Sequence, residues 1–217
     1  QQAKIYASVK RLNVPFVFSS NGYQFVEYDN FTGLTHAPRP MTEFPSPADL
    51  RGRYEQHKGF SLDSDAAKPL VTPYSKGEGG RRYYQDAAIR AVLEKIATGE
   101  KRALLTLATG AGKTYIAVNL LKRIADSGQL RRALFLCDRD ELRNQGLGAF
   151  QDEFGSDAAA ASTNSPEKNA RLLVATYQTL GVDTEEGDAS FLTRNYPENY
   201  FSHIVIDECH RSAWGKW

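Results

Sequence analysis

LATGAGKT, residues 107–114, joins two segments of different character. The apolar run ALLTL (103–107) predicts a buried strand, and KTYIAVNLLKRIADSG (113–128) has the apolar spacing of an amphipathic helix. Glycines let a backbone approach phosphate closely, and the N–H groups at the start of a helix point at an anion. The stretch therefore predicts a phosphate-binding loop in an α/β domain. A glycine turn before an ordinary helix is the weaker alternative.

The residues of this loop have separable roles. Lys113 can reach the β- and γ-phosphates of a nucleotide, and the Thr114 hydroxyl can coordinate Mg²⁺. The strict pattern GxxxxGK(S/T) has glycine where this chain has Leu107, but GAGKT keeps the residues that contact phosphate. We therefore expect ATP and Mg²⁺ as cofactors. The binding candidates are Thr109, Gly110, Ala111, Gly112, Lys113 and Thr114.

A second polar group follows the apolar run HIVI (203–206). Asp207 and Glu208 would emerge at the carboxyl end of this buried strand, where open α/β sheets bind their ligands. Asp207 would hold Mg²⁺, and Glu208 would orient and polarise the attacking water. An acidic strand end that caps a loop is the alternative, but the GAGKT loop on a neighbouring strand favours catalysis.

Apolar strands and helices alternate from Arg81 onward. Two further strands, ALFLC and RLLVAT, lie among three helices, namely YQDAAIRAVLEKIATG with Gly99 as its stop, the helix after GAGKT, and a weaker one from Asp140. Strands that are apolar on both faces predict a parallel sheet covered by helices on both sides. The polar stretches 155–170 and 181–190 are predicted to be surface loops.

The residues before Arg81 have a different sequence pattern. Asn21-Gly22 lies between the β-rich runs of VPFVFSSNGYQFVEYD, which predicts a hairpin. Residues 35–80 are rich in proline and glycine around one helical stretch, PADLRGRYEQH. We interpret them as a connector packed over neighbouring surfaces, and a flexible linker is nearly as consistent with the composition.

Composition sets limits on the environment. The 217 residues are 41% hydrophobic and 24% charged with a net charge of +1, which gives no general attraction to nucleic acid. The apolar runs are too short to span a bilayer, and no secretory leader stands at the start. Cys137 and Cys209 have no CxxC partner, so reduced and mostly buried thiols are predicted. We expect a cytoplasmic protein without a membrane segment.

ATGAGKT and DECH, in this order, resemble motifs I and II of superfamily 2 helicases of the DExH kind. These are two-lobed RecA-like motors that hydrolyse ATP and move along nucleic acid. The resemblance implies that RRYYQDAAI is a Q motif whose Gln85 reads adenine, although a polar helix start explains it too. LFLCDRDELRNQ resembles motif Ia and VATYQTL resembles motif Ib. The resemblance implies that Arg139, Gln145, Thr176 and Gln178 contact DNA. For each of these two segments, a plain strand end is the alternative.

The opening QQAKIYA, with Gln2 and Tyr6 in a QxxxY pattern, precedes this hairpin, connector and motor. The whole order resembles the restriction (R) subunit of type I restriction–modification enzymes, in which a PD-(D/E)xK nuclease domain precedes the motor. The resemblance implies a nuclease-domain tail (1–34) with Gln2 and Tyr6 nuclease-associated, a connector (35–80) and a RecA-like lobe (81–217) truncated after motif II. It also implies double-stranded DNA, a methyltransferase subunit and a specificity subunit as partners.

Two other functions stay open. A type III restriction or repair helicase shares the DExH core, and a nucleotide-binding domain could switch or assemble without moving along DNA. GAGKT paired with DECH and a Q-like helix argues against the second. The 217 residues contain no motif III and no second lobe with arginine fingers, which are worth roughly a thousandfold or more in phosphoryl transfer. We therefore expect negligible ATP hydrolysis from these residues alone.

Overall fold

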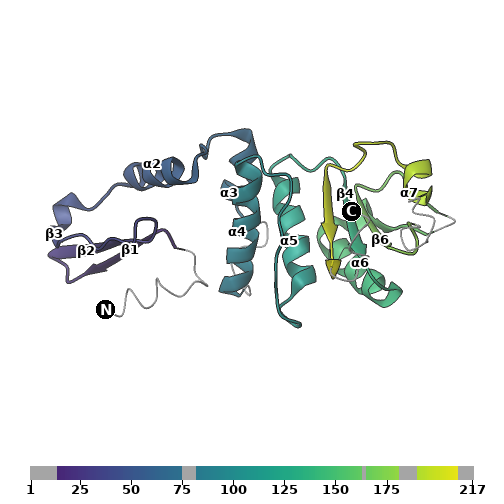
Figure 1. Ribbon diagram of the computed structural model, residues 1–217, viewed down its shortest axis with the longest axis horizontal. Helices are drawn as coiled ribbons and strands as arrows, with labels where there is room; N and C mark the ends of the chain where they lie inside the picture. Colours follow the sequence, from purple (N-terminus) through teal and green to yellow (C-terminus); the bar gives the residue numbers. More distant parts are fainter. Residues whose placement is uncertain (1–13, 75–81, 163–164, 181–189, 210–217) are drawn as a thin grey trace. The chain divides into compact units, whose positions relative to one another are not determined.

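The computed structural model describes residues 14–74, 82–162, 165–180 and 190–209. The chain forms two compact units (Figure 1). The hairpin unit comprises Gln1–Val71 and Lys76–Thr106, and the sheet unit comprises Thr72–Ser75 and Leu107–Trp217. The predicted helix with Gln2 and Tyr6 lies outside the described residues, and the domain boundaries at 34/35 and 80/81 stay predictions.

The predicted hairpin is present in the hairpin unit. Strands β1 (Phe16–Ser20) and β2 (Gln24–Asp29) pair antiparallel, and β3 (Arg39–Pro40) adds a short third strand beside β2. At the tip, Gly22 has φ +91°, a conformation that glycine adopts without strain. The Asn21 side chain accepts hydrogen bonds from the N–H groups of Tyr23 and Gln24, so the Asn-Gly pair makes the turn.

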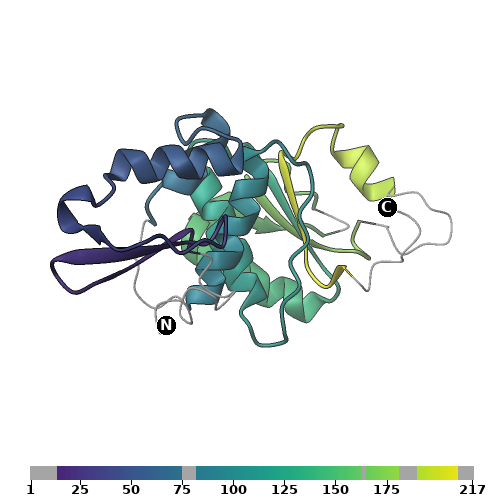
Figure 2. The same ribbon diagram turned by 60° about the vertical axis from the view of Figure 1, so that its left-hand side comes forward.

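Helix α2 (Pro47–Lys58) begins at Ser46, whose side chain forms a capping box with Asp49. It ends at Gly59, which has φ +76°. The short helices η1 (Met41–Glu43), η2 (Asp65–Ala67) and α3 (Lys68–Val71) flank it, and α4 (Tyr83–Ala97) packs against η2 and α3. Figure 2 shows α2 running beside the hairpin. Side chains of α2 make ion pairs with β2 and with α4, so this part of residues 35–80 packs on neighbouring elements, while its role as a connector stays a prediction.

Asp29 gives this packing a pH dependence. Burial alone would raise the pKa of Asp29, but hydrogen bonds from the N–H groups of Phe31 and Thr32, together with Arg53, lower it below its ordinary value. A lowered carboxyl pKa stabilises the fold above the unfolded-state pKa, and the contribution is lost as pH falls through the folded-state value.

We expect Asp29→Asn to lower the free energy of unfolding by about 1–3 kcal/mol at pH 7, because it weakens hydrogen bonds of a buried carboxylate. The difference from wild type should shrink as pH falls below about 4. Urea unfolding at pH 7 and pH 3 measures both. Asp63→Asn, on an exposed carboxylate paired with Arg51, is the control and should change little. An equal loss at both pH values for Asp29→Asn would contradict this assignment.

The sheet unit contains a four-stranded parallel sheet in the order β5-β6-β4-β7 (Figure 1). Its strands are β4 (Ala133–Cys137), β5 (Ala158–Ala160), β6 (Leu172–Thr176) and β7 (His203–Ile206). Its helices are α5 (Lys113–Asp126), α6 (Asp140–Phe154), η3 (Gly155–Asp157) and α7 (Ser190–Asn195). None of the helices in the described ranges is long and apolar enough to cross a bilayer.

Alternate residues of β4 pack on opposite faces of the sheet. Phe135 contacts Phe150 of α6, with ring centroids 5.1 Å apart. Leu134 and Leu136 belong to a buried cluster that includes Tyr196, the residue after α7. All five residues of β4 and of β6 are buried. The predicted parallel sheet with helices on both faces is therefore confirmed, because only a sheet covered on both sides buries consecutive residues.

Three strand predictions differ from the structure. HIVI (203–206) forms β7, but it is not the buried strand that was predicted, because β7 lies at the edge of the sheet and Ile204 and Ile206 are 57% and 39% exposed. Residues 103–107 form no strand among the described residues, and Leu104 and Leu105 are 74% and 38% exposed. An apolar run becomes a strand only when a neighbouring strand offers hydrogen bonds, and the division between the units falls inside this run. Conversely, Ala158–Ala160 lies in a predicted loop but pairs with β6 as an edge strand.

Candidate functional site

The loop before α5 has the backbone that its glycines predict. Gly110 and Gly112 have φ values of +77° and +80°, which a residue with a Cβ would adopt only under strain. Gly112 is the N-cap of α5, and Lys113 is the first helical residue. The first N–H groups of a helix have no partner within it, so this end of α5 can receive an anion.

The structure brings GAGKT and DECH together. Nζ of Lys113 lies 2.6 Å from Oε1 of Glu208, although the residues are far apart in the chain. The two side chains are 29% and 26% exposed, and partly exposed ion pairs contribute at most about 1 kcal/mol. A nucleotide phosphate can therefore replace Glu208 as the partner of the Lys113 ammonium, because breaking the ion pair loses little free energy.

The turn after β7 is held by hydrogen bonds of the main chain and the side chain of Asp207. Its N–H donates to the carbonyl of Leu136, 2.8 Å away, and its Oδ1 accepts the N–H of Glu208 at 3.0 Å. The hydroxyl of buried Tyr177 donates to the Asp207 carbonyl at 3.4 Å. Glu208 itself has φ +50°, which is uncommon for a residue with a side chain. Strained residues of this kind cluster at functional sites.

The Asp207 carboxylate fits a cation. Burial raises the pKa of Asp207, and the charge of Glu208 raises it further, while the Glu208 N–H and Lys113 only partly offset this. The ionised form is therefore less favourable than in a solvated aspartate, and a bound cation would offset this. Within the described ranges, no three His, Cys, Asp or Glu side chains gather in a metal site. Thr114 and Asp207 fit Mg²⁺ that is held mainly by nucleotide phosphates and water.

We expect Asp207→Asn to stabilise the nucleotide-free chain. A raised carboxyl pKa means that folding is penalised as pH rises from the unfolded-state pKa through the folded-state value, and the amide removes this penalty. The melting temperature at pH 7 should rise by about 2–4 °C, and the gain should vanish near pH 3. Scanning calorimetry at both pH values measures it. A lower melting temperature at pH 7 would show that the charge of Asp207 is not a burden.

Gln85 lies at the start of α4 and is 7% exposed. Its Oε1 accepts the N–H of Arg82 at 3.1 Å, and its own N–H donates to the Arg82 carbonyl at 2.8 Å. The side chain thus supports the helix start, as the alternative interpretation predicts. Its contact with adenine stays a prediction.

The motif Ia residues are on the surface. Arg139 precedes α6 with a 65% exposed side chain, and its Nε lies 3.3 Å from Oδ2 of Asp138. Gln145 is exposed on α6. Both are accessible to a DNA backbone, and their contact with DNA stays a prediction.

The motif Ib residues lie beside an open hollow of about 270 Å³. Thr176 is buried, its hydroxyl lies 2.9 Å from that of Thr179, and Gln178 is exposed. Arg143 lies on α6, one turn after Arg139, and also lines the hollow. Its Nη1 lies 2.9 Å from Oδ1 of Asp140. Sequence reasoning missed Arg143, although its i,i+4 spacing from Arg139 was a usable signal. The lining comprises Asp140, Arg143, Ser162, Thr176, Gln178 and Thr179.

Cys137, at the end of β4, is buried and free, as predicted. Burial raises the pKa of its thiol to about 11, so it stays protonated at neutral pH and is a weak nucleophile. Cys209 forms no disulfide and is partly exposed.

Known proteins resemble this chain along nearly its whole length. The endonuclease subunit of the type I restriction enzyme EcoAI from Escherichia coli is 34% identical over 99% of this chain and 27% of its own length. The EcoKI endonuclease subunit from Escherichia coli strain K12 is 31% identical over 93% of this chain and 18% of its own length. The chain thus spans about a quarter, or less, of these relatives.

A solved structure and a family model agree with these relatives. The structure is described as a fragment of an HsdR subunit of a type I restriction enzyme from Vibrio vulnificus YJ016. It is 29% identical with a TM-score of 0.73, over 97% of this chain and 36% of that one. The model of the family described as "Type III restriction enzyme, res subunit" matches residues 79–217. The resemblance to type I restriction subunits is confirmed, and the chain belongs to the family described as the res subunit of type III restriction enzymes.

Proposed function

We propose that this chain is the nucleotide-binding part of an ATP-dependent restriction endonuclease subunit that translocates double-stranded DNA and cleaves it. The observation that carries the proposal is the 2.6 Å contact between Lys113 and Glu208, because it joins a phosphate-binding loop to a carboxylate at the end of a parallel strand. Similarity to type I endonuclease subunits over nearly the whole chain supports the same function.

The residues of the site act in a defined order. The N–H groups at the start of α5 and the Lys113 ammonium bind the β- and γ-phosphates. Lys113 then leaves Glu208, and the freed carboxylate accepts a hydrogen bond from the attacking water. Thr114 and Asp207 would hold Mg²⁺, which when bound would neutralise charge on the phosphates. Nucleotide arrival and release of the catalytic carboxylate are thereby one event.

The rest of the proposal concerns DNA and partners. Arg139, Gln145, Thr176 and Gln178 contact the DNA backbone, and Gln85 reads adenine. Residues 1–34, with Gln2 and Tyr6, belong to a nuclease domain, 35–80 connect it to the motor, and 81–217 form the first motor lobe. The protein works in the cytoplasm with a methyltransferase subunit and a specificity subunit.

The dependence of nucleotide binding on Mg²⁺ tests this function. We expect Mg²⁺ to tighten ADP binding by about tenfold or more in calorimetric titrations of the chain. Thr114→Val should lose most of that gain, because valine keeps the shape of threonine but has no oxygen for the metal. The control is Thr98→Val at the end of α4, where the hydroxyl donates to the Lys95 carbonyl. ADP affinity that is equal with and without Mg²⁺ would contradict the proposal.

A further inference from the structure

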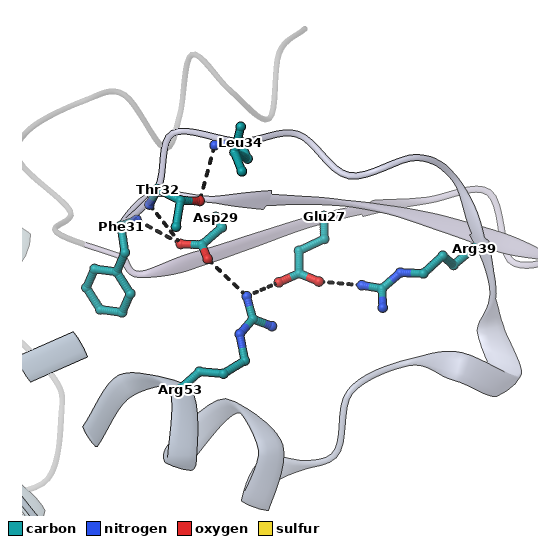
Figure 3. Close-up of polar contacts among 7 residues, drawn as sticks. All are labelled: Glu27, Asp29, Phe31, Thr32, Leu34, Arg39 and Arg53. Atoms are coloured by element: carbon teal, nitrogen blue, oxygen red, sulfur yellow. Dashed lines mark hydrogen bonds and ion pairs between the residues drawn. The ribbon is translucent and has the colours of Figure 1, made fainter. Parts of the chain in front are cut away.

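Helix α2 is tied to the hairpin through Arg53 (Figure 3). Its Nη2 lies 2.5 Å from Oε1 of Glu27 and 3.2 Å from Oδ2 of Asp29, both on β2. The Glu27 side chain is only 1% exposed, and its other oxygen lies 2.5 Å from Arg39. The Arg53 guanidinium also lies 4.3 Å from the centre of the Phe16 ring. Arg53 therefore meets two carboxylates of β2 and one ring of β1, and these contacts together fix the position of its guanidinium.

The next residues of α2 are tied to α4. The Tyr54 hydroxyl donates to Oε1 of Glu94 at 2.7 Å, and Nζ of Lys58 lies 2.6 Å from Oε2. Glu94 has an 11% exposed side chain, and α2 thus engages both of its oxygens. Burial, and then the bond to Glu94, raise the pKa of Tyr54, so the hydroxyl stays a donor at neutral pH.

These directional contacts hold α2 together with the ring of Phe31, which stacks on His57 at 3.7 Å and lies 6.2 Å from the Tyr54 ring. None of the residues of α2 is fully buried. Charge-assisted hydrogen bonds have a preferred distance and angle, so they fix a position more tightly than a sliding apolar contact does. Arg53 faces the hairpin while Tyr54 and Lys58, four residues apart, share the side toward Glu94. Helix α2 therefore links two elements that are distant in the chain.

We propose that α2 is a strut through which Arg53, Tyr54, Lys58 and Glu94 act as positioning residues for Gln85. Glu94 and Gln85 are on the same helix, about 14 Å apart at the rise of an α-helix, so a displacement of Glu94 moves Gln85. The preference for adenine thereby depends on the hairpin. This inference rests on the proposed function, in which Gln85 reads adenine.

The ratio of ADP affinity to GDP affinity tests the strut. We expect wild type to prefer ADP, and Glu94→Gln to reduce the preference by at least about fivefold, because the amide weakens the contact with Lys58. The matched control is Glu100→Gln, which breaks an exposed pair with Lys95 beyond the other end of α4. If Glu94 has a purely structural role, Glu94→Gln will lower the melting temperature and leave the ratio of ADP affinity to GDP affinity unchanged. That result would overturn the inference.

Hydrogen exchange tests the link to the hairpin. In Arg53→Met, amides in the first turn of α4 should exchange at least about fivefold faster, although Arg53 contacts β2. Faster exchange that is confined to β2 and α2 would overturn the strut.

Failure of the strut can be distinguished from failure of the proposed function. If Gln85→Ala abolishes an ADP preference that Glu94→Gln leaves intact, only the strut is wrong, whereas a chain that binds no ADP contradicts the proposed function itself.

Discussion

ATP hydrolysis should fall by about two to four orders of magnitude when Glu208 is replaced by glutamine, the usual contribution of a positioned acid–base group. Glutamine keeps the size and hydrogen-bonding reach of glutamate but has no basic carboxylate to polarise water. The measurement is steady-state ATP turnover in a protein that contains this chain together with a second motor lobe. In the function that we propose, DNA cleavage depends on translocation driven by ATP, so DNA cleavage by the variant should also be lost.

Nucleotide binding should survive the same substitution. Lys113, Thr114 and Asp207 remain, and Lys113 no longer has a carboxylate 2.6 Å away to compete with phosphate. Since a partly exposed ion pair is worth at most about 1 kcal/mol, affinity should improve by less than about tenfold. Glu198→Gln, on the exposed turn after α7, is the control for the chemical change. Hydrolysis within tenfold of wild type would show that Glu208 does not position the water.

Local sequence signals predicted much of the fold. Asn21-Gly22 predicted the hairpin turn, in which Gly22 has φ +91° and Asn21 contributes through its side-chain hydrogen bonds rather than through a positive φ. The apolar runs of β4 and β6 specified strands buried on both faces. Residues 103–107 carried the same signal without forming a strand, because a strand also needs a partner. The alanines of β5 pair through the main chain, and their side chains give no strand signal.

The candidate nucleotide site was predictable in part. The sequence predicted that GAGKT and DECH belong to one site, and Nζ of Lys113 lies 2.6 Å from Oε1 of Glu208, a direct contact that was not predicted. The left-handed backbone of Glu208 was not predictable, because glutamate has no preference for positive φ. The use of Gln85 to support its own helix start competes with its predicted contact with adenine, and the sequence alone could not decide between them.

The ion pairs around α2 were beyond prediction from sequence. Glu27, Arg53 and Glu94 are ordinary charged residues in a chain that is 24% charged, and any of them could have faced solvent. Their pairing depends on which elements meet in the folded unit. Long-range polar contacts therefore become visible only once the hairpin, α2 and α4 have been placed by their local signals.

We expect Lys113→Ala to reduce the affinity for Mg²⁺-ADP by about 10- to 100-fold. The ammonium group makes charge-assisted hydrogen bonds to phosphate, which are worth about 1.5–3 kcal/mol each. The loss should be specific to the phosphate site, because the Lys113 side chain is partly exposed and its removal opens no cavity in a buried core. Folding should therefore be little affected, and the melting temperature without nucleotide checks this.

Calorimetric titration of Mg²⁺-ADP into wild type, Lys113→Ala and Lys122→Ala tests the central claim most directly. Lys122 lies on the same helix α5, where it pairs with Asp126, so its removal deletes an equal charge away from the loop. We predict unchanged affinity for Lys122→Ala and a loss of about 10- to 100-fold for Lys113→Ala. The same affinity for Lys113→Ala and wild type would contradict a nucleotide phosphate site in residues 109–114.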